Sequence, residues 1–258
     1  MLNLETVSVA YDGRDVVKDV SLCVHAGESL AIIGSNGSGK TSLLSAMANL
    51  IPFRGEICLD GQSIRAMPRL ALARCIAMLG QVAEVYFSYS VFDAVLMGRY
   101  PHRERGLLGR YSEADRAATA DCIRMVGLSG LESRSVATLS GGERQRVFLA
   151  QVFAQDPAII LLDEPTNHLD LTYQIELIDY LNHWRGQNSR AVVGVLHDVN
   201  LAMRLSDRLL LLKDGAIFAD AKADEAVAAG LFDAVFDTDV GQYMQASLMR
   251  WRDVFGDR

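Results

Sequence analysis

Eight residues near the N-terminus have the types and spacing of a loop that binds phosphate groups. Residues 34–41 read G-S-N-G-S-G-K-T, which fits the pattern G-x-x-x-x-G-K followed by Ser or Thr without a mismatch. The glycines let backbone N–H groups point at phosphate oxygens, Lys40 supplies a positive charge, and the Thr41 hydroxyl can coordinate Mg²⁺. The pattern therefore predicts a nucleotide site, and a surface turn rich in Gly and Ser is the alternative. The residues expected to contact the nucleotide are Gly34, Ser35, Asn36, Gly37, Ser38, Gly39, Lys40 and Thr41.

The residues on either side of this loop predict the strand and helix that such a site needs. Residues 29–33 form an apolar, β-rich run typical of a buried strand, and residues 41–50 have the pattern of a helix. The N-terminal end of that helix favours a bound anion because of the helix dipole. The loop thus has the context of a phosphate-binding site.

Two acidic residues follow a second apolar run. Residues 159–162 read I-I-L-L, and Asp163 and Glu164 come directly after them. Ligands of open α/β sheets bind at the carboxyl ends of the strands, where these two side chains are expected. Asp163 can hold Mg²⁺ directly or through water, and Glu164 can polarise an attacking water as a general base. The alternative is a plain strand that ends in a charged turn.

Composition and charge limit the class of protein. Of the 258 residues 50% are hydrophobic and 22% are charged, which is typical of a soluble globular protein with a large core. The four scattered cysteines, Cys23, Cys58, Cys75 and Cys122, indicate reduced, mostly packed thiols. No apolar run reaches 18 residues and no basic region precedes an apolar one at the N-terminus, so we expect neither a membrane span nor a signal peptide. The net charge of −7 argues against a general nucleic-acid-binding protein, although a local basic patch stays open.

The order of the predicted elements indicates an α/β fold. Residues 1–59 contain short alternating apolar segments that favour strands, partly antiparallel. Residues 68–135 are mostly helical in pattern, and one helix is expected from a Ser cap at 112 to a stop at Gly127. From Ser140 onward helices and strands alternate, which implies a parallel sheet. The expected elements there are helices at 141–154, 171–184 and 199–205 and strands at 158–162, 191–196 and 208–212. The region after Gly215 has a mixed pattern.

In their order along the chain, the motifs resemble those of the nucleotide-binding subunit of ATP-binding-cassette (ABC) transporters. They are G-S-N-G-S-G-K-T, Gln81, L-S-G-G-E-R-Q-R, L-L-D-E-P-T-N-H-L-D and L-H-D, and the resemblance covers essentially the whole chain. It implies an α/β P-loop NTPase fold with a RecA-like core sheet, an N-terminal antiparallel β subdomain and an α-helical signature subdomain. One domain would span residues 1–258, with the helical part at about 82–155. ATP and Mg²⁺ are the implied cofactors, and ATP hydrolysis coupled to transport is the implied activity.

The resemblance also gives roles to residues around the phosphate loop. Tyr11 is similar to the aromatic that stacks on adenine, although simple turn packing would also explain it. Gln81 resembles the glutamine that reaches Mg²⁺ and the attacking water. Asp163 matches the metal-associated acid and Glu164 the catalytic acid. His197, which is also expected at the carboxyl end of a strand, matches the switch histidine near the γ-phosphate. The remaining four histidines do not have the spacing of metal ligands, so we expect no metal site besides that of nucleotide-bound Mg²⁺. They are His25, His102, His168 and His183.

A second group of residues resembles the signature of the family. Ser140, Gly141 and Gly142 are similar to the residues that bind the γ-phosphate of an ATP held by the other subunit, and 167–170, ending at Asp170, resembles the loop that crosses the dimer interface. Ser140 sits where an N-cap belongs, so this helix start is a second anion site. A head-to-tail pair with two ATP molecules between the subunits would use both sites. The family more often has glutamine at position 143; glutamate there suits the helix dipole.

The implied partners are a second copy of the chain and a membrane permease. The segment 81–102 is unusually aromatic and apolar, and in the family it receives a cytoplasmic helix of the permease; core packing would explain about half of its apolar residues. M-G-R-Y-P-H, H-D-V-N-L-A-M-R-L-S-D and the chain length resemble ATPases of bacterial iron-siderophore, haem or cobalamin importers, and molybdate importers share this subunit type. A periplasmic or surface solute-binding protein is an indirect partner. The location implied is peripheral, on the cytoplasmic face of the inner membrane.

A soluble ABC ATPase of translation, DNA repair or chromosome structure is the second class considered. Repair and chromosome ATPases insert long coiled coils between the phosphate loop and the signature, whereas about a hundred residues without a heptad run separate them here. Translation factors of this type usually carry two cassettes, and this chain has one. A fused exporter would need membrane spans. A non-catalytic regulatory cassette is the third possibility, yet every polar residue that the chemistry needs is present.

Overall fold

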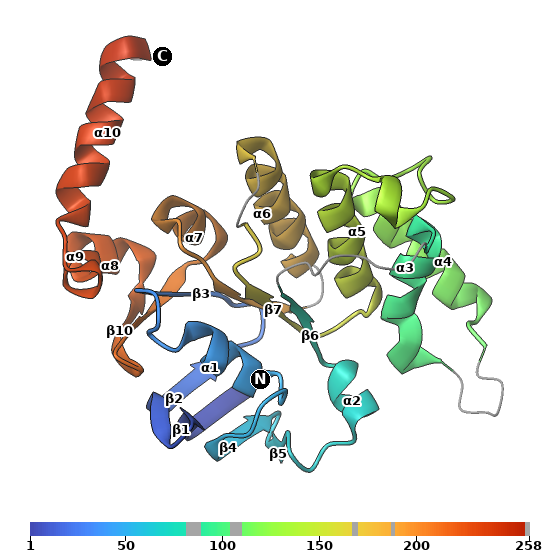
Figure 1. The fold of residues 1–258 in the computed structure, drawn as a ribbon, viewed down its shortest axis with the longest axis horizontal. Coiled ribbons are helices and arrows are strands. Elements are labelled where there is room, and N and C mark those ends of the chain that lie inside the picture. The colour runs from blue at the N-terminus through green and yellow to red at the C-terminus, as the bar shows by residue number, and fades with distance from the viewer. Residues whose placement is uncertain (81–88, 104–109, 167–169, 187–188, 256–258) are drawn as a thin grey trace.

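A six-stranded sheet forms the centre of the computed structural model, which describes residues 1–80, 89–103, 110–166, 170–186 and 189–255 (Figure 1). Its strand order is β10-β9-β3-β8-β7-β6, and every neighbouring pair is parallel except β10 with β9. The strands are β3 (Ser29–Gly34), β6 (Ile76–Leu79), β7 (Ile159–Asp163), β8 (Ala191–Val195), β9 (Arg208–Lys213) and β10 (Ala216–Lys222). The parallel sheet predicted from the alternation of helices and strands is confirmed.

A smaller antiparallel sheet is built by the N-terminal residues. Its order is β2-β1-β4-β5, with β1 (Leu2–Tyr11), β2 (Arg14–Val24), β4 (Arg54–Leu59) and β5 (Gln62–Ser63). Helix α1 (Lys40–Met47) lies between this sheet and the central one, and its side chains Leu43, Leu44 and Met47 are fully buried in the core that the two sheets share. Burying a leucine of this kind contributes on the order of 2 kcal/mol, so α1 is held by packing on both sides.

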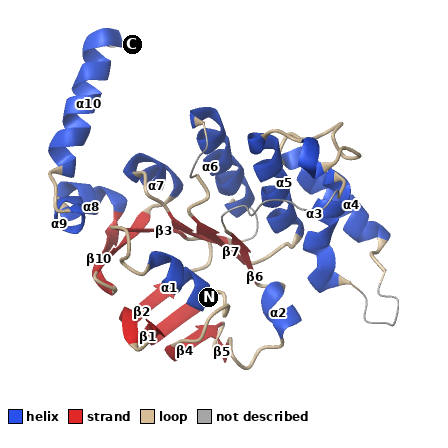
Figure 2. Ribbon diagram, viewed as in Figure 1, coloured by secondary structure: helices blue, strands red, loops and turns tan. Residues whose placement is uncertain are grey.

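Helices α5 (Gly141–Ala154), α6 (Leu171–Arg185) and α7 (Val199–Leu205) cover the other face of the central sheet (Figure 2). The shorter elements α3 (Val91–Leu96), η1 (Met97–His102) and η2 (Val136–Thr138), together with helix α4 (Glu113–Met125), pack on α5. A second hydrophobic core joins them to the sheet, and within it Phe153 of α5 stacks on Trp184 of α6 with ring centroids 5.9 Å apart. Helix α2 (Arg69–Ala73) precedes β6.

Element boundaries agree with the sequence patterns to within a few residues. The helices expected at 141–154 and 199–205 have those bounds, and the helix with the Ser112 cap runs over Glu113–Met125, with Gly127 in the left-handed region at φ 70°. The helix expected at 41–50 ends earlier, at Met47, because Asn49 adopts a positive φ of 54° that a helix cannot contain. After β10 the chain forms α8 (Ala223–Ala228), α9 (Leu231–Phe236) and α10 (Val240–Phe255), an order that the mixed pattern did not reveal.

No helix among the described segments is long and apolar enough to cross a membrane.

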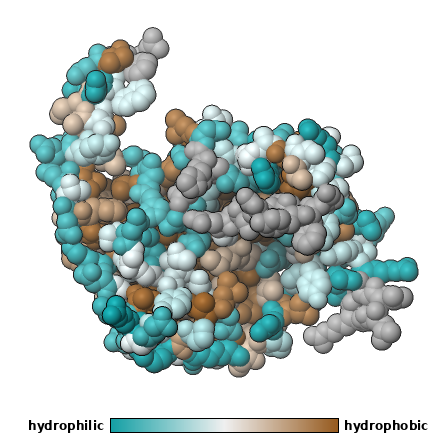
Figure 3. Space-filling model, in the orientation of Figure 1, coloured by the Kyte–Doolittle hydropathy of each residue, from teal (hydrophilic) through white to brown (hydrophobic). Residues whose placement is uncertain are grey.

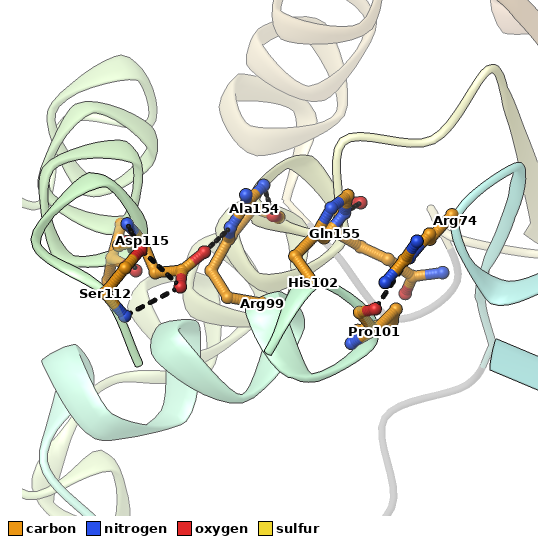
Figure 4. A network of polar contacts seen from close by, with 9 residues as sticks. Arg74, Arg99, Pro101, His102, Ser112, Asp115, Ala154 and Gln155 are labelled. Carbon is orange, nitrogen blue, oxygen red and sulfur yellow. Dashed lines mark hydrogen bonds and ion pairs between the residues drawn. The ribbon is translucent and has the colours of Figure 1, made fainter. Parts of the chain in front are cut away.

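A network of polar contacts joins the C-terminal end of α5 to η1 and α4 (Figure 4). Arg99 Nε donates to Asp115 Oδ1 at 2.9 Å, and Arg99 NH1 donates to the carbonyl of Ala154 at 3.0 Å. Burial raises the pKa of Asp115, but hydrogen bonds from Ser112 and Arg99 outweigh it and hold that pKa below its usual range. Asp115 is only 4% exposed, so its charge depends on these partners.

Replacing Arg99 by Met should therefore lower the stability of the protein. The buried carboxylate of Asp115 would lose its ion pair with Arg99, which costs roughly 2–4 kcal/mol in comparable cases. The measurement is the free energy of unfolding in urea at pH 7. The matched control is Arg124→Met, which removes an exposed ion pair with Asp121 and should change stability by about 0.5 kcal/mol or less. Equal effects of the two variants would contradict this view of the network.

Candidate functional site

The loop 34–41 lies between the end of β3 and the start of α1, and two glycines allow it to pack closely. A Cβ at Gly34 would stand 2.3 Å from the carbonyl oxygen of Leu212, and a Cβ at Gly39 would stand 2.3 Å from that of Val16. Gly39 also has a φ of +93°, which strains any other residue. The loop can therefore approach the backbone of β9 and β2 only with glycine at both positions.

The Lys40 side chain is buried within this loop. Its Nζ donates hydrogen bonds to the carbonyl oxygens of Gly34 and Ser35, each at 2.9 Å, and the residue is 5% exposed. Burial lowers the pKa of Lys40 from its ordinary value, although the carboxylates of Glu164 and Asp163 act to raise it. A partly desolvated ammonium at the N-terminus of a helix suits a phosphate group.

The loop also holds a buried hydroxyl that no described residue satisfies. Ser38 is 3% exposed, and its Oγ has no hydrogen-bond partner among the described residues. Buried polar groups are normally paired, so an unpaired one needs an explanation. The backbone N–H groups of the first turn of α1 have no partner within the helix, and they are the donors that this part of the loop offers to an anion.

Thr41 and Asp163 bring two oxygen atoms together at the end of β7. Thr41 Oγ1 donates to Asp163 Oδ1 at 2.9 Å. Burial raises the pKa of Asp163. The hydrogen bond from Thr41 acts to lower this pKa, and the negative charge of Glu164 acts to raise it. A hydroxyl and a carboxylate are the hard donors that Mg²⁺ prefers. The described residues form no cluster of three His, Cys, Asp or Glu side chains, and Mg²⁺ usually takes few protein ligands besides water and phosphate oxygens. The donor set therefore fits Mg²⁺ bound together with a nucleotide.

Glu164 and His197 form a close pair beside these groups. His197 Nε2 lies 2.5 Å from Glu164 Oε1, and both side chains are partly exposed. Glu164 has a φ of 51°, a strained value for a residue with a side chain, and its N–H donates to the carbonyl of Val195 at 3.1 Å. His197 follows β8, so the ends of β3, β7 and β8 bring the loop, the two acids and the histidine together.

A cavity of about 230 Å³ lies at this junction. The residues that line it are Val16, Asn36, Gly37, Gly39, Lys40, Thr41, Ser42 and Glu164. Val16 and Ser42 were not among the predicted residues; Val16 comes from β2, and only the packing of the small sheet against the loop places it there. Tyr11 lies at the end of β1, half exposed, and does not line the cavity. Gln81 lies outside the described residues.

Ser140 starts α5 with reciprocal hydrogen bonds. Its Oγ accepts from the Glu143 N–H at 3.3 Å, and the Glu143 carboxylate accepts from the Ser140 N–H at 2.8 Å. Hydrogen bonds to the Glu143 carboxylate, first from the backbone N–H and then from the hydroxyl of Ser140, lower the pKa of Glu143. The glutamate that departs from the common family residue thus serves as the acidic half of a capping box.

Ser140, Gly141 and Gly142 line a different cavity, of about 830 Å³. Asp170 lines it too and caps α6, where its Oδ1 accepts from the Tyr173 N–H at 2.8 Å. Residues 167–169 of the same predicted loop lie outside the described residues. This cavity shares no lining residue with the one at the phosphate loop. The two predicted anion sites are therefore separate within one chain.

A third cavity, of about 800 Å³, was not predicted from the sequence. We call it the apolar groove; its lining includes Leu50, Ile51, Pro52, Phe53, Met67, Leu72, Ile76, Met78 and Gln155. The run L-I-P-F at 50–53, which begins three residues after the end of α1, was the available signal, because exposed apolar residues that gather on a surface mark a docking site. The groove reaches β6, which ends just before residue 81.

Comparisons with known proteins agree on one family. A family model described as ABC transporter matches residues 17–167. The petrobactin import ATP-binding protein FpuD of Bacillus anthracis is 38% identical over 236 residues, 91% of this chain and 86% of that protein. The hemin import ATP-binding protein HmuV of Burkholderia pseudomallei (strain 1710b) is 38% identical over 87% of this chain and 89% of that protein. The solved dimeric structure of a bacterial ABC transporter cassette superposes with a TM-score of 0.74 at 27% identity, covering 86% of this chain and 99% of that one.

Replacing Asp163 by Asn should stabilise the protein in the absence of metal and nucleotide. The pKa of Asp163 is raised in the fold, so the folded protein favours the protonated carboxyl group over the ionised one. The stability that Asp163 contributes is therefore fully present below the ordinary carboxyl pKa of 3.8 and is lost as the pH rises through the folded pKa. At pH 7 we expect the variant to melt at a Tm higher by roughly 2 °C, and the difference should vanish near pH 4. Scanning calorimetry across this range makes the measurement. The exposed Asp12→Asn should show no such pH-dependent gain, and a lower Tm for Asp163→Asn at neutral pH would be the contrary result.

Proposed function

Because the chain belongs to the ABC transporter family and matches its ATP-binding subunits over most of its length, we propose that it hydrolyses ATP with Mg²⁺ to power import of a metal chelate through a membrane permease. The observation that carries the proposal is the meeting of Lys40, Asp163 and the Glu164–His197 pair at three adjoining strand ends. Each residue type there is one that phosphoryl transfer to water needs.

The loop 34–41 would bind the β- and γ-phosphates. Its glycines let the backbone N–H groups come close, and the Lys40 ammonium would exchange its bonds to the two loop carbonyls for phosphate oxygens. Thr41 and Asp163 would hold Mg²⁺, with Gln81 as a further expected ligand; the ion would supply positive charge to the leaving phosphate. Tyr11, half exposed at the end of β1, would cover the adenine.

Glu164 would act as the general base for the attacking water. Its carboxylate lies at the rim of the cavity that Lys40 and Thr41 line, and His197 fixes its position through the 2.5 Å contact. The constrained backbone of Glu164 adds to this, because a left-handed residue bonded to Val195 has little freedom to turn. A base held in this way is oriented before the substrate arrives.

Two copies of the chain would complete the site. The cavity at Ser140, Gly141 and Gly142 is separate from the phosphate loop, so a single chain cannot place both groups on one ATP. A head-to-tail pair puts the signature helix of each copy over the nucleotide of the other, and the Asp170 loop would lie at that interface. Closure around two ATP molecules and reopening after hydrolysis would drive the permease between its two states.

The permease would dock on the apolar groove and on the neighbouring part of segment 81–102. Tyr100, an exposed aromatic residue, lies in the described part of that segment, and Gln155 connects the groove to α5 through bonds to the carbonyls of Ala73 and Ile76.

The relatives FpuD and HmuV are import ATP-binding proteins for petrobactin and hemin, which supports an iron chelate or haem as cargo, with cobalamin in the same class. The subunit would then lie on the cytoplasmic face of the inner membrane, and a periplasmic or surface solute-binding protein would deliver the cargo.

Replacing Glu164 by Gln should leave ATP binding intact and lower turnover by about 100-fold or more, because the amide cannot accept a proton. Phosphate release gives the rate, and a fluorescent ATP analogue gives the affinity. The control is Glu225→Gln on the exposed face of α8, which should hydrolyse ATP like the parent protein. Unchanged turnover in Glu164→Gln would remove this residue from the role of base.

The shared site can be tested by mixing two inactive variants. Lys40→Met disables the phosphate loop, and Ser140→Arg blocks the signature. In a mixed pair one site carries both defects and the other carries none, so an equal mixture should regain about one quarter of the parent activity. Each variant alone serves as the control. If the mixture is as inactive as its components, the site does not combine residues from two copies.

A further inference from the structure

Two helices start at the same cavity, and an ion pair joins them behind it. The cavity is the one of about 830 Å³ described above, which we call the signature cavity. α5 starts there after its cap Ser140, and α6 starts there after its cap Asp170. Arg146 NH1 of α5 donates to Glu176 Oε2 of α6 at 3.1 Å. Each of these two residues lies six positions after the cap of its helix, so the ion pair joins the second turns.

The contacts between α5 and α6 differ at their two ends. At the C-terminal end Phe153 of α5 stacks on Trp184 of α6, so the two helices lie side by side (Figure 1). At the N-terminal end the first two residues of α5 are Gly141 and Gly142, which have no side chains to pack on α6. The ring of Tyr173 lies beside Gly142, where an added Cβ would stand 3.8 Å from Tyr173 Cδ2. The ion pair adds a directional contact near the cavity, because it links one atom of α5 to one atom of α6.

The side chain of Arg146 is held by Glu176. The two side chains are 24% and 37% exposed, so water and salt screen their attraction less than that of a pair on the open surface. Arg146 Nε is buried and has no hydrogen-bond partner among the described residues. Arg146 is also the only Lys or Arg among the described residues that line the cavity, so no second cation of this lining could take its place beside Glu176.

We propose that Arg146 and Glu176 are positioning residues for ATP hydrolysis. Their ion pair sets the start of α5 against the start of α6, so that Ser140 and Asp170 meet the nucleotide of the other copy in one fixed arrangement. The inference rests on the proposed function, in which residues of two copies share one ATP. A shift of about 1 Å between reacting groups can lower a rate by about 100-fold, so the relative position of the two helix starts matters.

The geometry favours this role over a direct contact between Arg146 and phosphate. A phosphate bound at a helix start meets the N–H groups of the first turn. Arg146 lies about 9 Å further along the axis than Ser140, because an α-helix rises about 1.5 Å per residue. Its guanidinium is also already bonded to Glu176. Arg146 therefore acts on the nucleotide through the position of α5.

Two single substitutions in the full-length protein test the proposal. Arg146→Met and Glu176→Met each remove the ion pair and leave an unbranched side chain. ATP turnover should fall by about ten-fold or more in both variants, because the two helix starts lose their fixed arrangement. The affinity for a fluorescent ATP analogue should stay within about two-fold of the parent's, because the cavity at the phosphate loop shares no lining residue with the signature cavity. Phosphate release gives the rate.

A charge exchange separates positioning from direct contact. Arg146→Glu combined with Glu176→Arg restores an ion pair between the same two helices, so the double variant should regain most of the turnover that either exchange alone removes. The matched control is Arg204→Met, which removes a different ion pair of α6, that of Asp179 with α7 at 2.9 Å. Neither of these two residues lines the signature cavity, so the control should hydrolyse ATP like the parent protein. Thermal melts show that each variant is folded.

Four results would overturn the inference. Turnover near the parent's in both Met variants would show that the pair has no role in hydrolysis. Loss in Arg146→Met alone would mean that Arg146 contacts the phosphate directly, and a folded but inactive charge-exchange variant would mean the same. Parallel loss of analogue binding and turnover would mean that the pair only stabilises the fold. A parent protein that hydrolyses no ATP would instead overturn the proposed function, and this inference with it.

Discussion

The close contact between two glycines and the neighbouring backbone is the constraint on which the site depends. No Cβ fits between Gly34 and the carbonyl of Leu212, or between Gly39 and that of Val16. With glycine at both positions, the loop lies against both sheets, and α1 begins at the ends of the central strands. This position buries the ammonium of Lys40 and brings Thr41 within hydrogen-bond distance of Asp163. A side chain at either glycine would displace all of these groups together.

Helix α5 links two surfaces that the proposed function uses separately. Ser140 caps its N-terminal end beside the signature cavity, and Gln155 at its other end lines the apolar groove. The helix is buried along one side, and Arg99 and His102 of η1 bind the carbonyls at its end. A permease helix pressed into the groove would therefore move the signature as part of a rigid body. In the proposed function, docking and nucleotide binding would then be connected through one packed helix.

The separation of the two anion sites explains why the chain presents surfaces that it does not cover itself. Ser140 and Asp170 face a cavity that none of the phosphate-loop residues lines, and α10, which has hydrophobic residues on its surface (Figure 3), exposes large apolar side chains such as Leu248 and Val254. Both features are costly in an isolated chain, because they expose a helix end and large apolar side chains to water. The helix end at Ser140 is accounted for if the functional unit is a pair of chains.

Local chemistry in the sequence determined the phosphate loop, the acids of β7, the Ser140 cap and the class of the fold. These depend on residue types at short spacing, such as Lys40 beside glycines or Asp163 after an apolar strand, which act in the same way wherever the chain places them. The tertiary structure alone decided that Val16 lines the cavity, that Glu164 pairs with His197 across 33 residues, and that Tyr11 lies apart from the lining. It also decided where the apolar groove lies and how far α10 extends. Contacts between segments that are distant in the sequence arise when whole faces of helices and sheets pack together. A residue pattern along the chain does not give the distance in space between such segments.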